Sequence, residues 1–139
     1  MIVFLDSDVI ISSLISRSGA SYLLLHTGDI TLFISNISFK ELQMVVKKLH
    51  IEEEGLNVLV KERLKTVMLK ETISNIKDQY REYVHDIDDA HVVAGAKAAK
   101  ARFLISYNIK DFKLNKIKND FNIIVMTPGR FLQYLRSLQ

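Results

Sequence analysis

Carboxylate side chains recur in this chain where a predicted strand ends or a predicted helix begins. A single carboxylate at such a position carries little information. Several of them can converge, because ligands bind in the crevice beyond the carboxyl ends of the strands in an open parallel sheet. Carboxylate oxygens gathered in one crevice are suitable ligands for a hard divalent cation such as Mg²⁺. The places are Asp6 to Asp8, Glu41, Asp86 to Asp89, and Asn108 with Asp111.

The first two places also have ordinary structural explanations. Asp6 follows an apolar run, and Asp or Ser at such a point accepts hydrogen bonds from the free N–H groups of a helix start. Alone, Asp6 is explained by a helix cap; with the other acids it is interpreted as a metal ligand, supported by Ser7 or Asp8. Ser38 and Glu41 have the spacing of a capping box. If Ser38 caps its helix, Glu41 can still turn toward the crevice.

The third place holds more carboxylates than a helix cap needs. Asp86, Asp88 and Asp89 precede an apolar helix, where one acid suffices to cap it and to complement its dipole. Like charges held close together repel, and a cation would relieve the crowding. Asp89 is chosen as the inward-facing carboxylate, with Asp88 as the neighbouring alternative. His91 is a candidate ligand or base, although a lone helical histidine is more often packed or on the surface.

Asn108 and Asp111 follow another predicted strand, where turn chemistry alone also favours Asn and Asp. In the functional interpretation, one or both reach the same ion. Other catalytic templates fit less well. The chain has no cysteine, no Gly-x-Ser-x-Gly and no glycine-rich phosphate loop after a strand, and its histidines lack zinc-like pairing.

Short apolar runs alternate along the chain with segments of helical periodicity, which predicts an α/β fold with a central parallel sheet and helices on both faces. Strands are expected at 2–5, 31–35, 103–106 and 123–126, with a short extended piece at 70–73. Helices are expected at 8–15, 20–26, 39–49, 51–68, 76–83, 90–101 and from Pro128 onward.

Length and composition limit the other possibilities. The 139 residues suit one domain spanning 1–139. The net charge of +3 is compatible with a nucleic-acid partner but is weak support for one. The lack of cysteine excludes disulfides and fits a reducing cytosol. No apolar stretch is long enough to span a bilayer, and no basic leader precedes the first strand, so we expect a cytoplasmic protein without a signal peptide.

The order and spacing of these segments resemble the PIN domain, the fold of VapC-type toxins and related nucleases. The similarity covers nearly the whole chain. No single motif is specific, but their succession is. The matching segments are 3–10, 38–42, 88–94, 104–112 and 126–132.

The resemblance implies a three-layer α/β/α fold and a Mg²⁺- or Mn²⁺-dependent endoribonuclease that hydrolyses RNA phosphodiester bonds. Matched motif by motif, the catalytic and metal-binding carboxylates would be Asp6, Glu41, Asp89 and Asp111. Some PIN proteins have Asp where this chain has Asn108, so the fourth ligand is open between Asn108 and Asp111, with Asp111 preferred. The supporting residues would be Ser7, Asp8, Ser38, Asp88 and Asn108.

The resemblance also implies partners: RNA as the substrate, a cognate antitoxin if the chain is the toxin of a VapBC-type pair, and a second copy in a homodimer. No membrane partner is expected. Two alternatives remain at this stage. One is a non-catalytic RNA-binding or assembly module on the same fold, against which the intact acids count. The other is a phosphoryl-accepting domain of flavodoxin type, which lacks its expected late lysine here.

Overall fold

The computed structural model describes residues 1–139 and contains one five-stranded parallel sheet. The strand order is β3-β2-β1-β4-β5, so the chain moves outward from β1 through β2 to β3 and then returns to the other side of β1. The switch point of this open sheet therefore lies between β1 and β4. The strands are β1 (Ile2–Leu5), β2 (Thr31–Ser35), β3 (Leu64–Val67), β4 (Phe103–Ile105) and β5 (Ile124–Met126).

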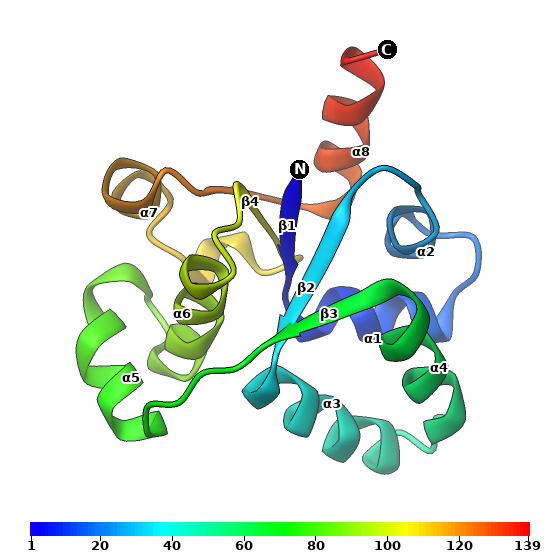
Figure 1. The fold of residues 1–139 in the computed structure, drawn as a ribbon, viewed down its shortest axis with the longest axis horizontal. Helices are drawn as coiled ribbons and strands as arrows, with labels where there is room; N and C mark the ends of the chain where they lie inside the picture. Colours follow the sequence, from blue (N-terminus) through cyan, green and yellow to red (C-terminus); the bar gives the residue numbers. More distant parts are fainter.

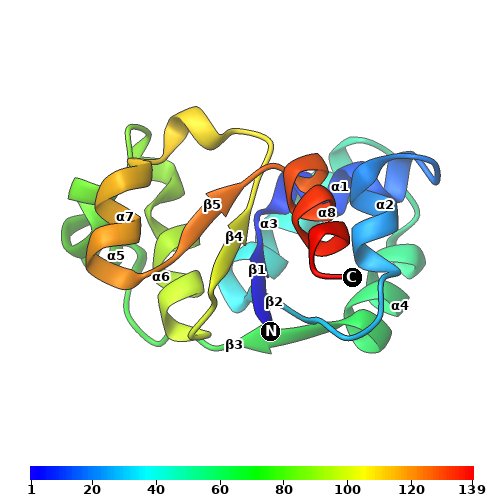
Figure 2. The same cartoon turned by 90° about the horizontal axis from the view of Figure 1, so that it is seen from above.

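Helices cover both faces of the sheet and complete the predicted three-layer α/β/α fold. Figures 1 and 2 show α5, α6 and α7 on one side, and α1, α2, α4 and α8 on the other. No helix combines the length and apolar character that a membrane span requires. The helices are α1 (Ser7–Ile15), α2 (Ala20–Leu25), α3 (Asn36–Lys48), α4 (Glu53–Arg63), α5 (Ile73–Tyr80), α6 (Ala90–Ala98), α7 (Leu114–Phe121) and α8 (Pro128–Ser137). Three short 3₁₀ turns are η1 (Arg81–Tyr83), η2 (Ile87–Asp89) and η3 (Ile109–Asp111).

The central strand β1 contributes to an apolar core on each face of the sheet. Successive side chains of a strand point to opposite faces. Val3 and Leu5 accordingly pack in the core under α1, α2, α3, α4 and α8, whereas Phe4 packs in the core under α5, α6 and α7. A strand buried on both faces needs apolar residues at every position, which explains the continuous run at 2–5.

Most predicted elements are confirmed, including β1 and β2 at the predicted residues. Two expectations are wrong, and one helix was not expected. Residues 64–67 form edge strand β3 instead of the end of a helix, residues 70–73 are not a strand, and α7 was not foreseen. Both missed elements bury little: of β3 only Leu64 is buried, and of α7 only Ile117. β3 therefore carries little apolar pattern, whereas Leu114, Ile117 and Phe121 give α7 a helical apolar spacing that the sequence interpretation missed.

Helix α6 lies close to the sheet because its residues are small. A Cβ added to Gly95 would come 2.7 Å from Cε2 of Phe4, a separation that side chains do not tolerate without movement. Phe4 is fully buried in the central strand, so the ring has no free space into which to move.

We expect Gly95→Ala to destabilise the protein by about 1–3 kcal/mol, because the added methyl overpacks the contact with Phe4. The matched control is Gly129→Ala in α8, where nothing lies within 4 Å of the added Cβ. Urea unfolding of both variants measures the difference. A Gly95→Ala protein as stable as the control would contradict the close packing of α6.

Candidate active site

Asp6 joins the two strands at the switch point of the sheet. It follows β1, and its carboxylate is 8% exposed. The N–H of Ser7 donates to Oδ1 at 2.8 Å, so Asp6 caps α1. The hydroxyl of Ser106, directly after β4, donates to Oδ2 at 2.8 Å. Asp6 is thus a helix cap, and its side chain at the strand end is held from two sides.

Asp8 fastens the loop that follows β4. Its Oδ2 accepts hydrogen bonds from the backbone N–H of Tyr107 at 3.0 Å and from Nδ2 of Asn108 at 3.2 Å. The N–H of Asn108 in turn donates to the hydroxyl of Ser106 at 3.0 Å. Asp8 and Asn108 therefore bind each other, and together they hold the loop that leads to Asp111.

A second group of carboxylates lies in the 3₁₀ turns η2 and η3 and at the start of η2. One oxygen each from Asp86, Asp89 and Asp111 lies within 4.8 Å of the others. Sequence reasoning assigned one inward carboxylate to the segment 86–89, but the structure contains two. Asp86 also accepts a hydrogen bond from the N–H of Asp88 at 3.0 Å, which is the cap expected in this segment.

The backbone brings these acids together. Val84, just before Asp86, forms an isolated antiparallel bridge with Phe112, just after Asp111. The N–H of His85 donates to the carbonyl of Asp111 at 2.8 Å. The two turns are thus tied to each other next to the residues whose carboxylates converge.

The predicted capping box at Ser38 and Glu41 is wrong. Helix α3 begins at Asn36, immediately after β2, so the residue in capping position is Ser35. Its hydroxyl accepts the N–H of Ser38 at 3.0 Å, and Ser38 is buried inside the helix. Glu41 lies one turn further on, where Nε2 of His91 contacts its Oε1 at 2.6 Å. His91 is buried, as the packed interpretation of a helical histidine expects.

Electrostatic coupling connects the acids around Asp6 with those around Asp89. Burial raises the pKa of Asp6 to about 7, helped by the negative charges of Asp8 and Asp89. Burial likewise raises the pKa of Asp89 to about 6, with contributions from Asp86, Asp111 and Glu41. Asp6 and Asp89 are therefore close enough for their charges to interact, and Asp86, Asp111 and Glu41 are close enough to act on Asp89.

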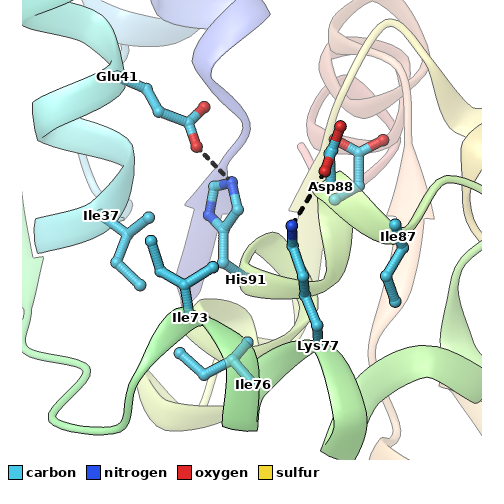
Figure 3. Close-up of a pocket in the computed structure, with 9 residues that line it drawn as sticks. Ile37, Glu41, Ile73, Ile76, Lys77, Ile87, Asp88 and His91 are labelled. Carbon is cyan, nitrogen blue, oxygen red and sulfur yellow. Dashed lines mark ion pairs between the residues drawn. The ribbon is translucent and has the colours of Figure 1, made fainter.

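Asp88 points to a different neighbour. Its carboxylate is 78% exposed and pairs with Nζ of Lys77 at 3.2 Å (Figure 3). Asp88 is outside the converging group, so the geometry distinguishes it from Asp89, which the sequence left ambiguous by one residue.

The fold and this edge of the sheet can be compared with known proteins. A family profile described as PIN domain matches residues 2–110. The chain belongs to the PIN domain family. No curated protein matches it.

Solved structures have the same fold as this PIN domain. One is VapBC2 from Rickettsia felis bound to a DNA fragment from its promoter, with a TM-score of 0.67, 22% identity, and coverage of 91% of this chain and 98% of that chain. For a toxin-antitoxin complex from Klebsiella pneumoniae the TM-score is 0.66 and the identity 23%, with coverage of 91% of this chain and 97% of that chain. For Mycobacterium tuberculosis VapC20, described as a sarcin-ricin loop cleaving toxin, the TM-score is 0.51 and the identity 11%, with coverage of 73% of this chain and 86% of that chain.

The donor set of this PIN domain fits a hard divalent cation. It consists of carboxylate oxygens, and none of the ion pairs of the protein joins Asp6, Asp86, Asp89 or Asp111 to a basic side chain. Two buried polar atoms beside Asp6, Oγ of Ser7 and Oδ1 of Asp8, have no hydrogen-bond partner. Crowded acids without a compensating charge are what a bound cation would stabilise.

The raised pKa of Asp6 predicts that the metal-free protein loses stability as the pH rises. The ordinary pKa of this carboxyl is 3.8, so between 3.8 and about 7 the folded chain holds a proton that the unfolded chain has released. The stabilising contribution is complete below 3.8, declines across this window and is absent above about 7. Asp89 adds to the same trend.

Thermal unfolding in a chelator at about pH 5 and about pH 8 measures this loss. We expect a lower Tm at the higher pH, a smaller difference in Asp6→Asn, and a larger stabilisation by Mg²⁺ at the higher pH. A wild-type Tm that stays constant or rises between the two pH values would contradict the burial of a crowded carboxylate.

The contact between Glu41 and His91 generates a separate prediction. Nδ1 of the buried His91 already has no partner, so Glu41→Ala would leave both ring nitrogens without one. We expect a loss of about 1–3 kcal/mol in urea unfolding, and a smaller loss for Glu41→Gln, whose amide still hydrogen-bonds. Glu62→Ala, at an exposed helical glutamate without an ion pair, is the control. Equal stability of the Ala and Gln variants would count against this contact.

Proposed function

We propose that this PIN domain is a Mg²⁺- or Mn²⁺-dependent endoribonuclease. The observation that carries the proposal is the convergence of carboxylates from Asp86, Asp89 and Asp111, with Asp6 close enough for the charge of Asp89 to act on it. No ion pair joins any of these four carboxylates to a basic side chain. In this proposal Asp6, Asp89 and Asp111 hold the cation, Asp86 adds charge beside them, and Glu41 borders them.

A bound cation would activate water and neutralise the phosphate of the RNA backbone. The protein residues supply position and charge. Ser7 and Ser106 fix both oxygens of Asp6, and Asp8 fixes the loop that carries Asp111. Without a cation these acids would repel a polyanion, so the same residues make RNA binding at this edge depend on the metal.

We also propose that the nuclease is the toxin of a VapBC-type pair. Support comes from the fold shared with structures described as toxin-antitoxin complexes. The proposed partner is then an antitoxin that covers the acidic edge. A homodimer is part of the same proposal, and Ile15 at the end of α1, which is 65% exposed, offers apolar surface for it.

Cleavage of single-stranded RNA in Mg²⁺ or Mn²⁺ tests the nuclease. We expect Asp6→Asn and Asp89→Asn to lower kcat/KM by at least about 100-fold, because each removes a proposed ligand of the cation. The control is Asp29→Asn. Asp29 is exposed and has a φ of 66°, which asparagine adopts well. It lies before the amino end of β2, whereas the site lies beyond the carboxyl ends of the strands.

Two outcomes would change the conclusion. Full activity in both site variants would show that the reaction takes place elsewhere. A wild-type protein that cleaves no RNA and binds no divalent cation would favour the non-catalytic RNA-binding or assembly module.

A further inference from the structure

A cavity of about 400 Å³ opens beside the acidic edge of the sheet. Its apolar wall consists of four isoleucines: Ile37 from α3, Ile73 and Ile76 from α5, and Ile87 from η2 (Figure 3). Glu41 and Asp89 also line the cavity. A ligand in this cavity would therefore lie directly next to the carboxylates of the proposed site.

We propose that this cavity binds the base of the nucleotide next to the phosphate that is cleaved. The proposal rests on the proposed nuclease function and deepens it, because it adds residues that select the RNA sequence. A phosphate on the acidic edge and a base in the adjoining cavity are parts of the same or neighbouring nucleotides, so one substrate can occupy both.

The chemistry of the wall favours a base over other parts of RNA. Glu41, Asp88 and Asp89 line the cavity and would repel a phosphate that entered it. A base is uncharged and flat, and the aliphatic isoleucine side chains can cover its faces. The volume lies within the range of about 300–1,000 Å³ that is typical of small-molecule sites.

Lys77 and Asp88 give the cavity a polar rim. Nζ of Lys77 and Oδ1 of Asp88 are 3.2 Å apart, so a donor and an acceptor lie side by side (Figure 3). Bases present donors and acceptors next to each other on the edges that proteins read in single-stranded RNA.

His91 supplies an independent indication of a ligand. It lines the cavity, is 7% exposed, and contacts Glu41 through Nε2. Its Nδ1 is buried without a hydrogen-bond partner. Buried polar atoms are rarely left unpaired, so this atom provides a reason for a polar ligand beside the isoleucine wall.

Methyl NMR of isoleucine-labelled protein tests the cavity without relying on catalysis. The four cavity isoleucines report on the cavity, and Ile15, exposed on α1, is an internal control. We expect the uncharged ribonucleosides, added in a chelator, to shift the cavity methyls and not Ile15. Ile73→Trp should abolish these shifts by filling the cavity. Because Ile73 is 54% exposed, folding should tolerate the change. Leu138→Trp, at a site 58% exposed directly after α8, is the matched control.

Mapping of cleavage sites on a randomised RNA connects the cavity to specificity. We expect Ile73→Trp to lower kcat/KM by about tenfold or more and to weaken the base preference at one position next to the cut. Lys77→Ala should change that preference, whereas Leu138→Trp should preserve it.

The outcomes separate the two proposals. RNA cleavage with silent cavity methyls and an unchanged cleavage pattern in Ile73→Trp would overturn the cavity proposal and leave the nuclease intact. Shifted methyls in a protein that cleaves no RNA would overturn the nuclease and retain a base-binding cavity. Shifts caused by an arginine-containing peptide and by no nucleoside would assign the cavity to a protein partner and overturn the proposal.

Discussion

Mutual repulsion of carboxylates is the constraint on which the architecture of this edge depends. Asp6 is buried, and its neighbours carry the same charge, so the folded chain must hold these groups where they would otherwise separate. Hydrogen bonds hold the carboxylate of Asp6 in place. The bridge between Val84 and Phe112 holds together the turns that carry Asp86 and Asp111. Burial and, to a smaller extent, this repulsion raise the pKa values of Asp6 and Asp89.

The topology of the sheet explains why such distant residues meet. Because β1 lies between β2 and β4, the residue after β1 comes next to the residue after β4, although β2, β3 and most helices separate them in the chain. Helix α3, which follows β2, and helix α6 also contact each other through Glu41 and His91. Residues of α3 and α5, Ile37 and Ile73, both line the cavity beside this region.

The sequence predicts features whose cause is local. The apolar run before Asp6 and the small residues before and after Gly95 predicted a buried strand and a closely packed helix. Asp6 was chosen as a candidate ligand only together with the other acids, because alone it is explained by a helix cap. The start of α3 was misplaced because Ser35 and Ser38 are equally good caps by type, and only the end of β2 decides between them.

Features that depend on tertiary contacts were beyond reach. Membership of Asp86 in the carboxylate group requires the pairing of two turns that are far apart in the chain, and no local pattern marks that pairing. The partnership of Glu41 with His91 likewise joins two helices. The bridge between the turns has one more consequence: it is made by main-chain atoms, which every residue except proline supplies. Evolution can therefore exchange the acids on these turns and keep the scaffold, so that catalytic competence and foldability can diverge independently in descendants of this chain.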